Sequence, residues 1–204
     1  MAGRRKKPID VKQACLDEAE RILESDGAEA INLREVARRL GISHNAPYMH
    51  YASRDHVVAA LVERSFDRFT EYLDRGRWGD TPEATVDGML VAYLDFAQTH
   101  PAALQLMFNG RLPDVSKHPT MLSRSRRAYH LLHAAVSELP VVKHREDTES
   151  AADMAAMFVW SSIHGFAILL QSYAWKRLGF SEDTKTQLAR RLASQIRAGL
   201  LAGG

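Results

Sequence analysis

The segment 43–50 carries side chains that can form hydrogen bonds to nucleic acid. Hydroxyl, imidazole, amide and phenol groups of this kind contact base edges and phosphates in the major groove of DNA. Four arginines stand between Ile31 and Arg54 against the single acid Glu35, and this charge pattern is typical of a phosphate-binding face. We expect the DNA contacts of this region to come from Asn32, Arg34, Ser43, His44, Asn45, Pro47, Tyr48, His50 and Arg54.

A second basic group opens the chain, where Arg4, Arg5, Lys6 and Lys7 follow one another without interruption. We expect this arm to add attraction to phosphates, with reading of a neighbouring minor groove as the alternative. The formal net charge of the whole chain is only +2, so the positive charge is concentrated in the arm and in the short region described above. Solvated surface charge is the competing interpretation of any one of these residues.

Two histidines three residues apart, His130 and His133, could supply two ligands of a metal ion, but no third ligand stands at a recognisable spacing. The chain also lacks the HExxH, P-loop, GxGxxG and nucleophile-elbow motifs of common enzyme classes. Its single cysteine, Cys15, cannot form an intramolecular disulfide. We therefore expect no catalytic residue, no bound metal and no cofactor.

Apolar residues recur at helical spacing along nearly the whole chain, and no alternating strand pattern of useful length interrupts them. The sequence therefore predicts an all-α fold of about nine helices. Small polar residues stand as N-caps before several helices, and glycines stand after others. The expected helical ranges are 10–25, 33–40, 43–50, 53–75, 82–100, 101–108, 120–139, 148–178 and 181–201.

The second and third expected helices are joined by a turn of three or four residues that begins at Gly41. Such a turn makes two short helices cross at a steep angle, as in a helix-turn-helix. Ala37 is small enough to let the second helix approach the first. The packing core of the pair would consist of Val36, Leu40, Ile42 and Tyr51. A purely structural helical hairpin is the alternative.

The segment NLREVARRLGISHNAPYMHY (32–51) and the following SRDHVVAAL (53–61) resemble the N-terminal DNA-binding domain of the TetR family of transcriptional regulators. The resemblance covers about the first 65 residues. It implies that Tyr48 and Arg54 contact backbone phosphates and that His44 and Asn45 are the first candidates for contacts with bases. It also implies a DNA-binding domain at 1–55 and a second domain at 56–204, with the helix from Ser53 connecting them. Pro47 departs from the usual pattern, and we expect a short or distorted recognition helix there.

The back half is similar to a branch of TetR-type C-terminal domains named for its Trp-His-Gly residues. The similarity lies in AYLDFAQTHPAALQLMF (92–108) and in the group Trp160, His164 and Gly165. A helical bundle rich in aromatic and methionine side chains can enclose an apolar ligand cavity, with ordinary core packing as the alternative for each residue. A structural role for His164 is as well supported as a ligand-binding role. The expected lining residues are Met89, Tyr93, Phe96, Met107, Phe108, Tyr129, Met157, Trp160 and His164.

An apolar stripe on the last expected helix needs a partner surface. The resemblance implies that the last two helices pair with their copies in a homodimer, and packing of the stripe within the chain is the alternative. A two-fold dimer presents two recognition helices, so it would bind a palindromic operator in double-stranded DNA. The residues expected at the dimer interface are Ile168, Leu169, Ser172, Trp175, Leu188, Leu192, Ile196 and Leu200.

Together these features favour a DNA-binding transcriptional regulator, in particular a repressor released by a small apolar or amphipathic ligand. A DNA-binding or interaction dimer that senses nothing is the alternative, activation instead of repression is open, and an enzyme is the least favoured class. No run of about 18 uncharged apolar residues exists, and no apolar segment follows the basic residues at the N-terminus. We therefore expect a cytoplasmic protein with no membrane partner.

Overall fold

The computed structural model describes residues 10–145, 147–173, 177–179 and 181–202, and its regular elements are all helical. This confirms the all-α prediction. The α-helices are α1 (Val11–Asp26), α2 (Leu33–Leu40), α3 (Arg54–Gly76), α4 (Pro82–Thr99), α5 (Pro101–Asn109), α6 (Pro119–Ser137), α7 (Pro140–Lys143), α8 (Thr148–Gln171) and α10 (Glu182–Ala202). Two short 3-10 helices, η1 (Ala28–Ala30) and η2 (Pro47–Met49), lie near the front of the chain.

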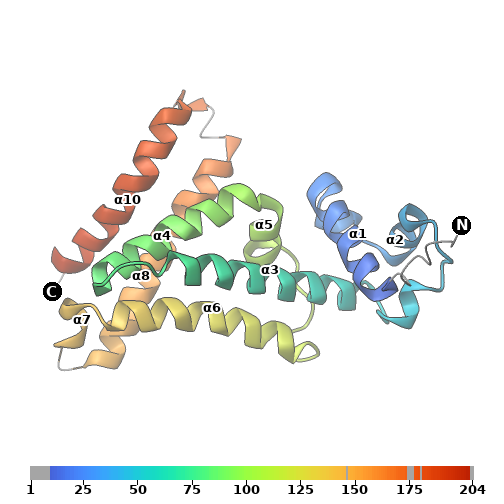
Figure 1. Ribbon diagram of the computed structural model, residues 1–204, viewed down its shortest axis with the longest axis horizontal. Helices are drawn as coiled ribbons and strands as arrows, with labels where there is room; N and C mark the ends of the chain where they lie inside the picture. The colour runs from blue at the N-terminus through green and yellow to red at the C-terminus, as the bar shows by residue number, and fades with distance from the viewer. Residues whose placement is uncertain (1–9, 146, 174–176, 180, 203–204) are drawn as a thin grey trace, which may run out of the picture.

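Helix α3 runs along the long axis of the molecule (Figure 1). Its first turns contact α1, and α1 packs against α2 to form one end of an elongated shape. Its remaining length packs between α4 and α6 and also contacts α5, while α8 packs against α4 and α6. Helix α10 lies against α4 and α8 at the far end. The core is therefore continuous from the front of the chain to the back.

Several helix ends form where the sequence predicts them. The Asn32 side chain accepts a hydrogen bond from the Glu35 amide at 2.8 Å, and the Thr81 hydroxyl accepts one from the Ala84 amide at 3.1 Å. Gly41, at φ +64° and ψ +30°, adopts the left-handed conformation after α2. These caps satisfy amides and carbonyls that a helix leaves unpaired at its ends.

Helices α3 and α4 cross with their backbones in contact at two glycines that the sequence analysis did not single out. A Cβ atom added to Gly88 would lie 2.0 Å from the carbonyl oxygen of Gly76. A Cβ atom added to Gly76 would lie 2.7 Å from the Cβ of Ala92. Only glycine at these positions permits the observed separation of the two helices, because the obstructing atoms include rigid backbone.

Helix α8 ends earlier than the sequence prediction of Leu178. Ser172 leaves the helical conformation at φ −78° and ψ 156°, and its hydroxyl donates to the carbonyl oxygen of Leu169 at 2.8 Å. Serine competes for backbone partners in this way, and no proline or glycine at this point announces the break in the sequence. Trp175, one of the expected interface residues, lies outside the described residues.

Helix α8 is also long and apolar enough, by length and composition alone, to cross a membrane. The core helix of a globular protein passes the same test, so this is weak evidence. In the structure α8 packs against α4, α6, α7 and α10. Its apolar character therefore serves the helical core and, as described below, an exposed face.

The glycine crossing leads to a stability prediction. Gly88→Ala should lower the free energy of unfolding by roughly 1–3 kcal/mol, because overpacking at the α3–α4 contact outweighs the better helix propensity of alanine. Urea denaturation followed by circular dichroism measures this. Val91→Ala on the exposed side of the same helix is the matched control and should stay within about 0.5 kcal/mol of the wild type. Equal stabilities of the Gly88 variant and the wild type would contradict the close crossing.

Candidate DNA-binding surface and ligand cavity

The front of the chain has the buried core that a helix-turn-helix needs. Val36 and Ala37 of α2 are fully buried, and Leu40 and Ile42 pack against the same core from the turn. Tyr51 is buried, and its hydroxyl donates to the carbonyl oxygen of Lys12 at 3.2 Å, which ties the end of the motif to α1. The predicted packing core of the motif is confirmed.

The second helix of the motif is not the regular helix that the sequence predicts for 43–50. A turn at 44–46 leads into η2, and the amides of Ala46 and Met49 donate to the carbonyls three residues earlier, Ser43 and Ala46, at 2.9 and 3.3 Å. Pro47 has no amide hydrogen, so it cannot donate to the Ser43 carbonyl as an α-helix requires. Pro47 is also buried, so the expectation that it faces DNA is wrong: its ring packs inward.

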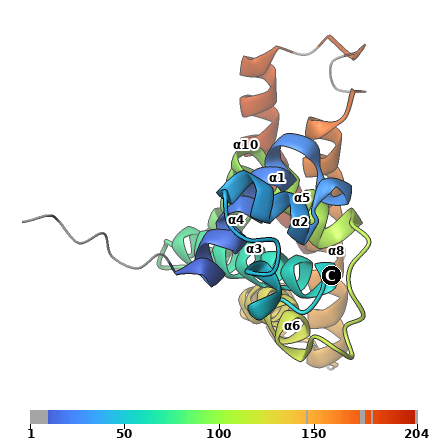
Figure 2. The ribbon, with the colours of Figure 1, turned by 90° about the vertical axis from the view of Figure 1, so that its right-hand side faces the viewer.

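The side chains that do face outward gather at one end of the molecule. Arg34, His44, Asn45 and Tyr48 line a single surface recess between α2 and η2. Ser43 and His50 are exposed beside these residues, and so is Asn32, although its side chain also caps α2. Figure 2 views the molecule from this end, with α1 and α2 toward the viewer.

Sequence reasoning missed Met49, which is 82% exposed on η2. Within the segment YMHY only the last tyrosine is buried. An apolar tip on a groove-facing surface can contact the methyl group of thymine. In the sequence Met49 is an apolar residue among polar and aromatic neighbours, and this pattern does not show whether its side chain is packed or exposed.

Most of the positive charge near this surface is neutralised within the chain. Arg38 donates to Glu35 at 2.7 Å through two nitrogens, and Arg39 donates to Glu35 at 2.8 Å and to Asp26 at 2.5 Å. Hydrogen bonds from Arg38 and Arg39 lower the pKa of Glu35 to about 2. Arg34 is exposed and has no ion pair to another described residue. Of the four arginines counted in the sequence, it is therefore the one whose charge faces the recess without compensation.

Arg54 faces the protein rather than solvent. Its guanidinium donates to the carbonyl oxygens of Ala28 at 2.8 Å and Ile31 at 3.0 Å, with Glu29 3.8 Å away. These bonds hold the first turn of α3 against η1. A phosphate contact by Arg54 stays a prediction, and it would have to compete with these two carbonyls. Arg4, Arg5, Lys6 and Lys7 lie outside the described residues.

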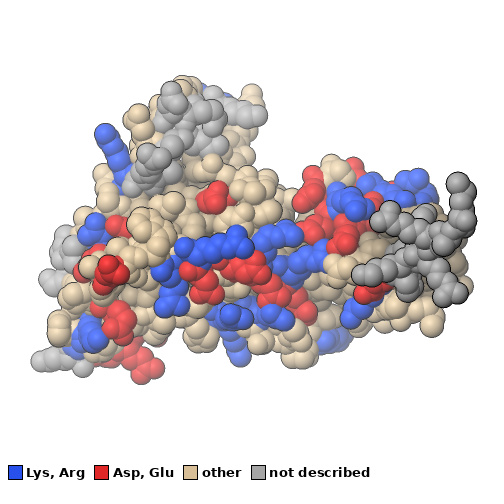
Figure 3. All heavy atoms as spheres, in the orientation of Figure 1, with Lys and Arg blue, Asp and Glu red and all other residues tan. Residues whose placement is uncertain are grey.

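An ionic cluster joins α1 to α3. Arg64 donates to Asp17 at 2.8 Å and to Glu20 at 2.7 Å, and Arg68 donates to Glu20 at 2.7 Å. Burial raises the pKa of Glu20, but hydrogen bonds from Arg68 and Arg64 outweigh it, and the pKa is lowered. Figure 3 shows basic and acidic side chains lying beside one another across the middle of this face rather than in blocks of one sign. The cluster fixes the angle at which α1 leaves the connecting helix.

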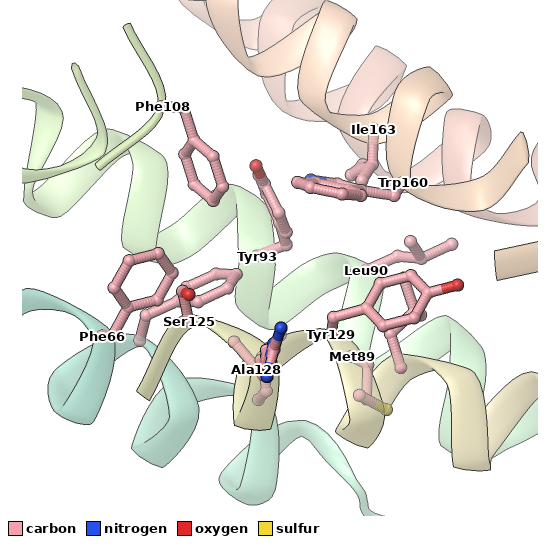
Figure 4. A pocket seen from close by; sticks show the side chains of 14 residues that line it. Phe66, Met89, Leu90, Tyr93, Phe108, Ser125, Ala128, Tyr129, Trp160 and Ile163 are labelled. Carbon is pink, nitrogen blue, oxygen red and sulfur yellow. The ribbon is translucent and has the colours of Figure 1, made fainter. Parts of the chain in front are cut away.

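A cavity of about 260 Å³ lies between α3, α4, α5, α6 and α8 (Figure 4). Its walls are almost wholly carbon, with aromatic rings on several sides. The lining residues are Phe66, Phe69, Leu73, Met89, Leu90, Tyr93, Phe108, Ser125, Arg126, Ala128, Tyr129, Leu132, Trp160 and Ile163. Met89, Tyr93, Phe108, Tyr129 and Trp160 were expected here from the sequence, although ligand binding by them stays a prediction.

Four expected lining residues are not in the lining: Phe96, Met107 and Met157, and also His164, which is described below. Phe96 is fully buried, with its ring centroid 5.0 Å from that of Phe69, and Met107 is buried outside the lining, so both serve the core. Met157 points outward and is 48% exposed. The lining that sequence reasoning missed comes chiefly from α3 and α6. The α3 stripe at 66, 69 and 73 was visible in the sequence as an apolar face, but nothing there separates cavity wall from filled core.

His164 stands behind the cavity wall rather than in its lining. Its Nδ1 atom lies 2.7 Å from the Tyr93 hydroxyl, and its ring centroid lies 4.9 Å from that of Phe108. Burial lowers the pKa of His164 and raises the pKa of Tyr93. A neutral imidazole therefore shares a hydrogen bond with the tyrosine hydroxyl, which fixes the orientation of the Tyr93 ring in the wall.

Helix α8 has a second, outward face that is apolar. Met154, Met157, Phe158 and Leu169 are exposed, although all are large hydrophobic side chains, and so is Tyr173, which follows the end of the helix. A Cβ atom added to Gly165, on the same helix, would meet nothing within 4 Å, so this face is open at its middle. Several large apolar side chains exposed on one helix indicate an interaction surface. We call this set, Met154, Met157, Phe158, Gly165, Leu169 and Tyr173, the α8 face.

The expected interface residues divide between this face and the core. Leu169 is 54% exposed, and Ile168 and Ser172 are half-buried. Ile196 is only 4% exposed, so the expectation that it faces a second chain is wrong. Helix α10 packs against α4 and α8 of its own chain, which also covers Leu188, Leu192 and Leu200 in part.

The two histidines considered as metal ligands have other partners or surroundings. The Nε2 atom of His133 lies 3.3 Å from an oxygen of Asp153, which also accepts a hydrogen bond from the Tyr129 hydroxyl at 3.2 Å. The His130 ring packs edge-on to Tyr129. Among the residues that the structure describes, no group of three or more candidate ligands could hold a metal ion.

Two family models match the chain on either side of the α3 midpoint. Residues 16–61 match the family described as bacterial regulatory proteins, tetR family, and residues 86–196 match the family described as tetracyclin repressor-like, C-terminal domain. The second match covers more than half of the chain. The likeness of the back half to the Trp-His-Gly branch stays a prediction.

Curated relatives and solved structures agree with these matches. The HTH-type transcriptional regulator Rv1816 of Mycobacterium tuberculosis is 27% identical over 46% of this chain and 41% of its own length. The nucleoid occlusion factor SlmA of Glaesserella parasuis is 24% identical over 40% of this chain and 41% of its own length. The chain therefore spans about two fifths of the length of these relatives. Rv0681, another HTH-type regulator of M. tuberculosis, is 24% identical over 95% of this chain and 84% of its own length.

Among solved structures, a Rhodococcus sp. RHA1 protein of unknown function has a TM-score of 0.78 at 24% identity and covers 98% of both chains. The regulatory protein SCO4313 has a TM-score of 0.73 at 20% identity, covering 96% of this chain and 98% of its own. The fatty acid degradation regulator FadR of Bacillus halodurans has a TM-score of 0.69 at 12% identity, covering 94% and 96%. At these identities the structures establish the fold.

The Tyr93–His164 pair leads to a prediction about pH. Because the pKa of His164 is lowered in the folded state, its contribution to stability is present above the unfolded pKa of about 6.5 and is lost as the pH falls below it. The free energy of unfolding of the wild type should therefore decrease between about pH 7.5 and about pH 5.5. In His164→Gln, which keeps a hydrogen-bond acceptor and removes the titration, the decrease should be smaller. Urea denaturation at both pH values measures it, and identical slopes would contradict burial of a neutral imidazole.

Proposed function

The chain belongs to the TetR family of DNA-binding transcriptional regulators, and from this premise we propose that it is a repressor that acts as a homodimer and is released from its operator by a ligand. The observation that carries the DNA-binding part is the recess of Arg34, His44, Asn45 and Tyr48 at one end of the molecule. It combines an uncompensated cation with short polar side chains that are all exposed, which is the chemistry of groove contact.

Each exposed side chain of this surface has a role that its chemistry supports. His44 and Asn45 would contact base edges, while Arg34 and Tyr48 would contact phosphates on either side of the groove. Met49 would add an apolar contact, with Ser43 and His50 as further polar contacts. Arg54 would act by holding α3 against η1, so that the recess keeps its shape. The basic residues 4–7 would add salt-dependent attraction to phosphates.

A second copy of the chain would cover the α8 face. Its large exposed side chains and the open Gly165 suit close helix-to-helix packing, and the similarity to the tetR-type C-terminal domain extends over this helix. Two-fold pairing through α8 would present two copies of the recess to one face of DNA. The operator would then be an inverted repeat.

The cavity would be the sensing site, because it is the apolar space that α3 and α5 share. Helix α3 continues from the cavity wall into the front of the chain, and α5 contacts both α3 and α1. A ligand that fits only one arrangement of these helices would favour that arrangement by its difference in affinity for the two. We assign residues 1–55 to DNA binding and 56–204 to sensing and dimerisation. The protein would act by binding rather than catalysis, in the cytoplasm where the DNA is.

The role of the recess is tested by Arg34→Ala. Loss of one phosphate contact in each of two copies should weaken binding to operator DNA and reduce the slope of log affinity against log salt by about 2. Fluorescence anisotropy at several salt concentrations measures both quantities. Arg191→Ala, an exposed arginine on α10, is the matched control and should leave the slope unchanged. If Arg34→Ala behaves like this control, the assigned surface is wrong.

The dimer is tested by Leu169→Glu. A charge in the middle of the α8 face should convert a dimer into a monomer, because the carboxylate would be buried without a partner. Sedimentation equilibrium gives the mass, and circular dichroism checks that the variant is folded. Val91→Glu, at another exposed apolar position, should remain dimeric. A wild type that sediments as a monomer at micromolar concentration would overturn the proposal.

A further inference from the structure

We infer that the cavity binds an anionic amphiphile, an aliphatic or aromatic monocarboxylate whose tail fills the cavity and whose carboxylate lies at Arg126. This inference rests on the proposed sensing function and adds the chemical class of the ligand. Of the lining residues, Arg126 is the one that carries a charge, and it is exposed while the wall around it is apolar. The cavity lining is almost wholly carbon, so the stem of Arg126 lines it while the charged end lies toward solvent, and we place the opening of the cavity there.

The charge of Arg126 is not taken up by the protein. Helix α6 contains Arg124, Arg126 and Arg127 and no acidic residue. Arg124 forms an ion pair with Asp67 of α3. Arg126 and Arg127 are exposed and form no ion pair with another described residue. The α6 side of the cavity therefore carries positive charge at Arg126, which favours an anionic group there over a cationic one, while the nearby carboxylate of Asp153 is hydrogen-bonded to Tyr129.

The interior offers little to a polar head group. The Ser125 hydroxyl donates to the carbonyl oxygen of Leu122 at 2.8 Å, and the Tyr93 hydroxyl is hydrogen-bonded to His164 at 2.7 Å. The third lining hydroxyl, that of Tyr129, donates to Asp153 at 3.2 Å. With all three hydroxyls already hydrogen-bonded, a carboxylate placed deep in the cavity would be buried without a free hydroxyl donor, which is costly. A carboxylate at Arg126 can accept two parallel hydrogen bonds from the guanidinium. The ligand should therefore enter tail first.

The size of the cavity limits the tail. Its volume of about 260 Å³ lies just below the range of about 300–1,000 Å³ for pockets of drug-sized ligands. At about 30 Å³ for each water-sized group, it holds roughly nine of them. Phe66, Phe108 and Trp160 surround this space and suit either an alkyl chain or a ring (Figure 4). Octanoate matches these dimensions, with its head at the opening.

Isothermal titration calorimetry with three probes of equal tail length tests the inference: octanoate, octanol and octylamine. The wild type should bind octanoate at least about tenfold more tightly than octanol, because octanol cannot form a charge-assisted hydrogen bond with Arg126. It should bind octylamine most weakly, because the ammonium group is repelled by the guanidinium. Arg126→Gln should weaken octanoate binding by about tenfold and leave octanol within about twofold. The matched control is Arg127→Gln, which removes the neighbouring exposed arginine that does not line the cavity. It should change octanoate binding by less than about twofold, and thermal melts of both variants check that they are folded.

Two results would overturn the inference. In the first, octanol binds as tightly as octanoate and Arg126→Gln leaves the affinity for octanoate unchanged. In the second, octanoate does not bind at all. A failure of the proposed sensing function is recognised separately. In that case octanoate binds with the expected dependence on Arg126, but saturating octanoate leaves the affinity of the protein for operator DNA unchanged.

Discussion

Burial of the apolar face of α3 is the interaction on which both functional regions depend. Its first half buries Val57, Leu61 and Val62 against the front of the chain, and its second half supplies Phe66 and Phe69 to the cavity wall. Each such side chain contributes about 1.5–3 kcal/mol when it is removed from water. One continuous helix of 23 residues therefore forms part of two packed regions at once. A movement of α3 at the cavity wall would therefore also move its first turns, which pack against the front of the chain.

Polar contacts set the orientation of the elements that this apolar burial brings together. Arg64 and Arg68 join α3 to the acids of α1, and Arg54 joins its first turn to carbonyls of η1. Ion pairs that are partly exposed add little net stability, so the main consequence of these contacts is geometric. They define the angle between the connecting helix and the motif that carries Arg34 and Tyr48. The recess is thus positioned by contacts within the protein.

Sequence reasoning was reliable where structure follows from local chemistry. The caps at Asn32 and Thr81 and the end of α2 at Gly41 depend on a few neighbouring residues, and they form as expected. Sequence reasoning failed where the burial of a residue depends on packing against another helix or another chain. Pro47 has a local effect on the backbone that the sequence indicates, but its burial depends on packing against the rest of the motif. The side on which Ile196 lies depends in the same way on whether α4 and α8 or a second chain covers it.

The central claim is that two copies of the recess contact one stretch of DNA in a sequence-dependent way. Selection of bound DNA from a random pool, followed by sequencing, tests it most directly. The account predicts enrichment of an inverted repeat whose half-sites are centred about one helical turn, or about 34–36 Å, apart or a multiple of it. Enrichment of no sequence, or of a single half-site without symmetry, would contradict it.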